Sequence, residues 1–105
     1  MLVGIMIVTI EKSLYDKLKE EAEKEEVSVG AIIREILLNY FELEDDTKSY
    51  VKRGVSNEII TVGEKQYVRL QVRLSRENEL IIRNELKRMK MSINQLLKNE
   101  ILLTA

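Results

Sequence analysis

The chain has 105 residues, 45 % of them apolar, and a formal net charge of −1 at pH 7. It contains no cysteine and no histidine, which excludes disulfides and thiolate metal sites and removes the commonest general base. No apolar run approaches the ~18 residues that a membrane-spanning helix needs. We therefore expect a small cytoplasmic protein with no cofactor, no metal, no small-molecule substrate and no membrane contact. The absence of proline and the many Glu, Lys and Ile residues favour a hyperthermophilic source.

The charge is distributed unevenly along the chain. Residues 1–41 carry eight acidic and five basic side chains, whereas residues 67–105 carry four acidic and eight basic ones. Such asymmetry between two parts of a chain favours nucleic-acid binding by the basic part.

Residues 1–41 follow the pattern of a strand, a helix, a short turn and a second helix. Ile5–Ile10 is a β-branched run typical of a strand. Glu11–Glu26 shifts to a helical period with a single apolar stripe, formed by Leu14, Leu18 and Ala22. Ser28 is a suitable N-cap for the apolar helix that follows it.

The predicted first strand is apolar on both faces. Met6, Val8 and Ile10 lie on one face, and Ile5, Ile7 and Thr9 lie on the other. Because strands of this kind are normally buried on both faces, we expect another part of the protein or a partner to cover the second face.

Residues 42–66 form a connection of mixed composition. An acidic tract begins it, and Ile59–Val62 is a short apolar run followed by Gly63. A hairpin with a Gly-containing loop is one interpretation of this pattern. We favour the other, an extended linker.

The next segment, Val68–Leu74, alternates strictly between apolar and polar residues. In a strand this places Arg69, Gln71 and Arg73 together on one face. Arg pairs in bidentate fashion with guanine, and Gln pairs likewise with adenine, in the major groove of DNA, which admits a two-stranded ribbon. The alternative is a strand whose outer face is merely solvated.

Two helices are predicted after this strand. Ser75 caps the first, which runs to about Lys90. Its apolar stripe is expected to contain Leu80, Ile81, Ile82, Leu86 and Met89. Ser92 caps the second helix, which is again apolar.

The two parts of the chain align with a constant offset of 64 residues. Ile10 falls on Leu74, and Ser28 falls on Ser92. Leu14 falls on Asn78, a mismatch that indicates a rotated or shifted helix in the second part. We interpret the chain as a tandem repeat with units 1–41 and 67–105 joined by residues 42–66.

A short strand, a capped helix, a turn and a Ser-capped apolar helix resemble the ribbon-helix-helix family of DNA-binding regulators, and the doubled form resembles its tandem members in archaeal filamentous viruses. The resemblance implies a mostly helical fold of two β-α-α units with short β-ribbons, paired into dimeric modules, and the host cytoplasm as location. It also implies that Arg69, Gln71 and Arg73 read bases. Phosphate-binding residues are then Ser92, Ile93 and Asn94 at a helix N-terminus, helped by Arg76.

The sequence departs from the family at two points. The turn between the helices often contains Gly in the family, but Glu26-Val27 and Lys90-Met91 occupy it here. The first strand also has no polar reader at Ile5 or Ile7.

These features predict a sequence-specific double-stranded DNA-binding transcription regulator. The units can pair within one chain or with their copies in a second chain; we favour the second option, a homodimer on a palindromic operator. The alternative function is a protein-interaction module, such as an antitoxin-like protein. An enzyme is not expected, because no set of nucleophile, base and orienting group is visible.

Overall fold

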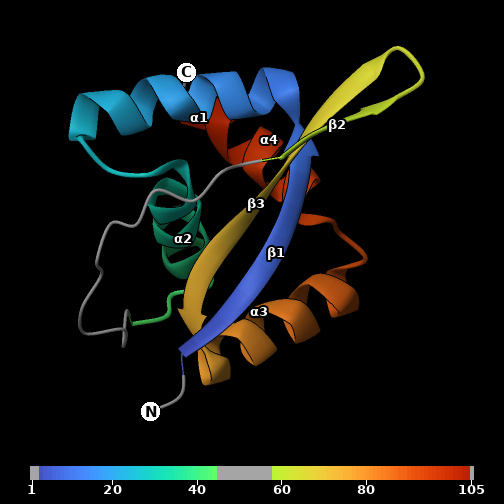
Figure 1. Cartoon of the computed structure of the whole chain (residues 1–105). Coiled ribbons are helices and arrows are strands. Elements are labelled where there is room, and N and C mark those ends of the chain that lie inside the picture. Colours follow the sequence, from blue (N-terminus) through green and yellow to red (C-terminus); the bar gives the residue numbers. More distant parts are fainter. Residues whose placement is uncertain (1–2, 45–57, 105) are drawn as a thin grey trace.

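The computed structural model describes residues 3–44 and 58–104. Helices predominate around a small antiparallel sheet, as the sequence predicted (Figure 1). The elements are β1 (Val3–Glu11), α1 (Lys12–Glu25), α2 (Val29–Tyr40), β2 (Glu58–Val62), β3 (Lys65–Ser75), α3 (Arg76–Met89) and α4 (Ile93–Thr104).

The sheet joins strands that lie far apart in the sequence. Its order is β1-β3-β2, and β1 pairs with β3 in antiparallel fashion over its whole length, from Val3 opposite Ser75 to Glu11 opposite Tyr67. Our preference for pairing each strand with its copy in a second chain was therefore wrong. β3 of the same chain supplies an antiparallel partner along one edge of β1, so the β1–β3 ribbon forms without a second copy.

A hairpin leads into β3, where we had favoured an extended linker. β2 pairs with the first part of β3, from Glu58 opposite Arg69 to Val62 opposite Lys65. Gly63 takes a φ of +62°, and this left-handed conformation lets the chain reverse in a two-residue turn. The linker prediction is thus wrong for residues 58–66, while residues 45–57 lie outside the described part of the chain.

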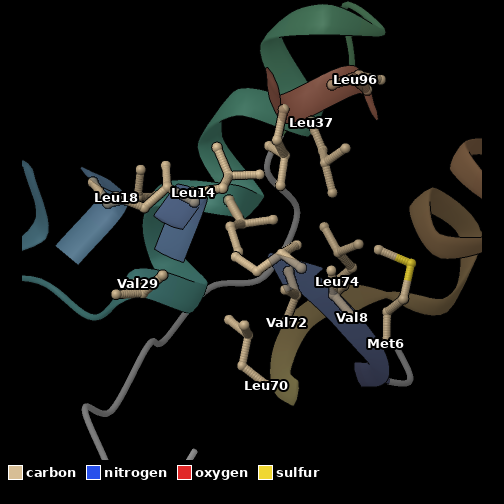
Figure 2. Packing of buried hydrophobic residues seen from close by; sticks show 14 of the residues in the cluster. Met6, Val8, Leu14, Leu18, Val29, Leu37, Leu70, Val72, Leu74 and Leu96 are labelled. Atoms are coloured by element: carbon tan, nitrogen blue, oxygen red, sulfur yellow. The ribbon is translucent and has the colours of Figure 1, made fainter. Parts of the chain in front are cut away.

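One face of the sheet packs against α2 and α4. Alternate residues of both long strands point into this layer, as their sequence pattern predicted: Met6, Val8 and Ile10 from β1, and Val68, Leu70, Val72 and Leu74 from β3. They meet Ile33 and Leu37 of α2 and Leu96 and Leu97 of α4, all at most 1 % exposed. Figure 2 shows Val72, Leu74 and Leu37 converging in this core.

Helices α1 and α3 bury equivalent stripes. Leu14, Leu18 and Ala22 of α1 are buried as predicted, and the buried residues of α3 are Asn78, Ile82 and Leu86. The offset of 64 therefore holds at all three positions, so α3 is neither rotated nor shifted. The predicted stripe of α3 was wrong at Leu80 and Ile81, which are 53 % and 41 % exposed.

Asn78 occupies a position where α1 has leucine. Its side-chain Nδ2 donates a hydrogen bond of 2.8 Å to the carbonyl oxygen of Glu44, which follows α2. A polar residue is tolerated at this buried site because its amide has a partner.

The turns between paired helices use left-handed residues without glycine. Glu26 ends α1 with a φ of 57°, and Lys90 ends α3 with a φ of 54°. At both, the backbone N–H groups cap the preceding helix, as glycine commonly does at this position. The turn geometry is thus retained despite the missing glycine.

Candidate nucleic-acid interface

The outer face of β3 carries the three predicted base-reading side chains. Arg69 and Gln71 are exposed and Arg73 is half-buried, because residues of β3 alternate between the core and this open face. In Figure 1, α2 and α4 lie behind the β1–β3 pair and leave its front open. No carboxylate whose side chain the structure describes forms an ion pair with either arginine.

The neighbouring strand adds apolar groups to the same face. Ile7 is 50 % exposed and lies opposite Gln71, and Thr9 is exposed and lies opposite Arg69. No described part of the chain covers these two residues, so cover from within the protein was a wrong expectation for them. Cover by a partner stays a prediction.

The width of the sheet changes along β3. At Arg69 the strand has a neighbour on each side, Thr9 of β1 and Glu58 of β2. At Gln71 and Arg73 the only partner strand among the described residues is β1. The open face is therefore a two-stranded ribbon at its Arg73 end and a three-stranded sheet at its Arg69 end.

Three of the predicted phosphate-binding residues lie at the start of α4, and the fourth, Arg76, lies at the opposite end of the β1–β3 ladder. The exposed Ser92 accepts a hydrogen bond of 3.1 Å at its Oγ from the Gln95 backbone N–H. Ile93 and Asn94 are half-buried, and their backbone N–H groups belong to the first turn, where helices lack internal acceptors. Arg76 is exposed at the first position of α3, directly after the end of β3.

The start of α4 is also fastened to the end of β1. Asn94 Oδ1 accepts a hydrogen bond of 2.9 Å from the Glu11 backbone N–H, and Lys98 Nζ lies 2.8 Å from Glu11 Oε2. The hydrogen bond from Lys98, followed by its charge and that of Lys65, holds the pKa of the Glu11 carboxyl below its ordinary value. The side chain of Asn94, which we predicted to lie at a phosphate site, thus already holds the end of β1 against the start of α4.

Gly30 was not singled out in the sequence. It lies in the first turn of α2, and a Cβ at this position would come 2.7 Å from the carbonyl oxygen of Gln71. Glycine therefore lets α2 touch the backbone of the strand that carries the arginines. The 64-residue offset gave no signal for it, since Asn94, which has a Cβ, stands at the equivalent position.

Comparisons with known proteins place this geometry in a family. The model of the "ribbon-helix-helix protein, copG family" matches residues 8–44, which include most of β1 and all of α1 and α2. A solved structure of AvtR, "a novel transcriptional regulator from a hyperthermophilic archaeal lipothrixvirus", is 38 % identical with a TM-score of 0.81 and covers 93 % of this chain and 99 % of its own. The chain belongs to the ribbon-helix-helix family.

Viral relatives share almost the whole chain. "Uncharacterized protein 28" of Sulfolobus islandicus filamentous virus is 72 % identical over 96 % of this chain and all of its own length. "Uncharacterized protein ORF100b" of Acidianus filamentous virus 2 is 46 % identical over 94 % of this chain and 99 % of its own. The resemblance to ribbon-helix-helix proteins of archaeal filamentous viruses is thus confirmed.

Neither a cluster of metal-ligating side chains nor a membrane-spanning helix occurs in the described part of the chain. Across residues 3–44 and 58–104, no group of three acidic side chains gathers as a metal site would require. Over the same ranges, no helix has the length and apolar character needed to cross a bilayer.

Proposed function

We propose that the chain is a transcription regulator that binds double-stranded DNA sequence-specifically by placing the β1–β3 ribbon in the major groove. The observation that carries the proposal is the open face on which Arg69, Gln71 and Arg73 stand side by side. Membership of the family and the likeness to AvtR, a transcriptional regulator, support it. The proposal assigns no catalytic step to the chain.

Residues 1–41 and 67–105 act in this proposal as two tandem units that together make one ribbon-helix-helix module. The pairing of β1 with β3 and the matching buried stripes of α1 and α3 support this division. One chain then supplies a complete ribbon. The homodimer on a palindromic operator predicted from the sequence requires two such chains that meet through other surfaces.

The ribbon enters the groove with its Arg73 end in this proposal. A major groove about 12 Å wide admits two strands, and strands lie about 4.8 Å apart in a sheet. Because β2 widens the sheet at Arg69, Gln71 and Arg73 approach the base edges more closely than Arg69 does. Ser92, Ile93 and Asn94, beside the Glu11 end of β1, bind one backbone phosphate, and Arg76, at the opposite end of the β1–β3 ladder, contacts a different one.

Selection of bound sequences from random duplexes, followed by titration of the selected site, tests the proposal. Arg73→Ala should weaken binding to the selected site by about 1–3 kcal/mol and binding to random duplex much less. Arg69→Ala should cost less than Arg73→Ala at the selected site. Equal losses on both duplexes for Arg73→Ala would refute its assignment as a base reader.

Arg88→Ala is the matched control. It removes the same charge from the exposed end of α3, where Arg88 Nη2 lies 2.6 Å from Glu85 Oε2. We expect a small loss that is equal on the selected and random duplexes, because only general electrostatic attraction changes. If wild type binds neither duplex even at low salt, the basic face is a solvated surface and the protein-interaction alternative replaces DNA binding.

A further inference from the structure

The two strands of the ribbon offer chemically different faces. β3 contributes Arg69, Gln71 and Arg73, whereas β1 contributes Ile7 and Thr9. Both strands belong to one chain, so no second copy of β3 stands opposite the first. A ribbon made of two identical antiparallel strands would present the same side chains twice, in opposite order along the groove. This ribbon does not.

Ile7 has no role in the core of the chain. The residues on either side of it, Met6 and Val8, are 1 % and 2 % exposed, while Ile7 is 50 % exposed. It shares the open face with Gln71, directly across the β1–β3 ladder. An isoleucine in the middle of a polar face gains from any apolar group that reaches it.

The major groove displays one apolar group. The C5-methyl of thymine marks every A·T pair, and aliphatic side chains recognise it by contact. Cross-strand neighbours have Cβ atoms about 5 Å apart, a distance between the rise of one and of two base pairs in B-DNA, about 3.4 and 6.8 Å. A thymine methyl next to a base contacted by Gln71 therefore lies within reach of Ile7.

We propose that Ile7 contacts a thymine methyl group and that one chain consequently recognises a non-palindromic segment of DNA. This inference rests on the proposed function. Thr9 adds a second small contact opposite Arg69. The charge and hydrogen-bonding groups of Arg69, Gln71 and Arg73 on the same face favour DNA over an apolar protein surface as the occupant.

Replacing thymine by uracil removes only the methyl group, which makes the test specific. On the selected duplex, each thymine is replaced in turn by deoxyuridine and the affinity of the full chain is measured. We expect one position at which wild type loses about four-fold in affinity, the effect of one lost methyl contact. Ile7→Ala should bind the unmodified duplex about as weakly as wild type binds that uracil duplex, and show no further loss on it.

Leu80→Ala is the control, since Leu80 is 53 % exposed on α3, away from the ribbon. This variant should keep the full thymine dependence. Indifference of wild type to uracil at every position would overturn the proposal, as would equal uracil sensitivity in Ile7→Ala. A palindrome selected by a single bound chain would also overturn it. These results leave the proposed function standing, whereas failure of the proposed function appears earlier, as an absence of sequence-specific binding.

Discussion

At the scale of single residues, three serines begin helices with the same hydrogen bond but in different surroundings. In each case the serine Oγ accepts a hydrogen bond from the backbone N–H three residues later. The distance is 3.1 Å at Ser28, 3.2 Å at Ser75 and 3.1 Å at Ser92. Ser75 is 1 % exposed, whereas Ser92 is exposed. Water can therefore replace the hydroxyl of Ser92 but not that of Ser75.

Ser75→Ala should destabilise the protein more than Ser92→Ala. Losing the buried cap leaves the Asn78 N–H without an acceptor, at a cost of about 2 kcal/mol. The exposed cap should cost about 0.5–1 kcal/mol. The free energy of unfolding from urea titration measures both, and equal losses would contradict the role given to burial.

The sequence predicted these caps because a Ser before an apolar period has a local meaning. It aligned Asn78 with Leu14, but we interpreted the mismatch as a rotated or shifted helix and did not predict that Asn78 would be buried. Asn78 is polar, and its hydrogen bond to the Glu44 carbonyl, across 34 positions of sequence, helps to make its burial tolerable. A partner so far along the chain is invisible to local pattern.

At the scale of elements, α3 illustrates where periodicity alone fails. Leu80 and Ile81 lie on a different face of the helix from Ile82 and Leu86, so α3 has more apolar residues than one stripe can hold. The sheet it packs against selects which stripe is buried. The 64-residue offset contained the answer, because α1 has a single unambiguous stripe and α3 repeats its phase.

The contact between α2 and β3 predicts a change in stability whose sign is opposite to the one that helix propensity gives. Gly30→Ala should stabilise an isolated helix by about 1 kcal/mol. In the folded protein the added Cβ meets the Gln71 carbonyl oxygen at 2.7 Å. We expect a net destabilisation of about 1–3 kcal/mol, because backbone on both sides has to move apart.

Asn84→Ala is the control for this substitution. Asn84 is exposed on α3, so propensity alone acts there and unfolding should become slightly less favourable. Chemical denaturation of both variants measures the difference. A Gly30→Ala protein as stable as Asn84→Ala would show that α2 can shift freely and that glycine is not required.

The junction between β1 and α4 predicts a dependence on pH. The pKa of Glu11 is lowered in the folded state, chiefly by the hydrogen bond from Lys98. Its contribution to stability is therefore fully present above the ordinary carboxyl pKa of about 4.3. That contribution is lost as the pH falls through the lower pKa of the folded state.

Lys98→Met isolates this contribution. Between pH 6 and pH 3 its melting temperature should fall less than that of wild type, because Glu11 no longer has a bound cation to lose. Lys87→Met removes the same charge from an exposed position of α3 and should retain the wild-type fall. Identical falls for wild type and Lys98→Met would assign the acid sensitivity to other carboxylates.

At the scale of the whole molecule, the pattern predicted the strands β1 and β3 but not that they would pair with each other. A strand edge presents the same backbone groups to any antiparallel neighbour, so β1 can in principle pair with β1 of another chain or with β3 of its own. The sequence pattern does not indicate which of these two strands β1 pairs with. In the structure β1 pairs with β3 of the same chain, and the open face with Ile7 opposite Gln71 is the consequence.

Splitting the chain tests this pairing directly. A fragment of residues 1–44 holds β1, α1 and α2, and a fragment of residues 58–105 holds β2, β3, α3 and α4. Each alone leaves half of the shared core exposed, since α2 packs on β3 and α4 packs on β1. We expect each fragment to be largely unfolded by circular dichroism at micromolar concentration, and an equimolar mixture to regain helix and unfold in one transition.

The stoichiometry of the mixture decides between the two modes of pairing. Intrachain pairing predicts a one-to-one complex of the fragments by analytical ultracentrifugation. It also predicts that Ile10→Asp in the first fragment abolishes assembly, because Ile10 is 0 % exposed opposite Val68. Thr9→Asp, exposed on the open face, is the matched control and should assemble normally. Two fragments that fold separately as homodimers would instead show that each unit pairs with its own copy and that the ribbon is symmetric.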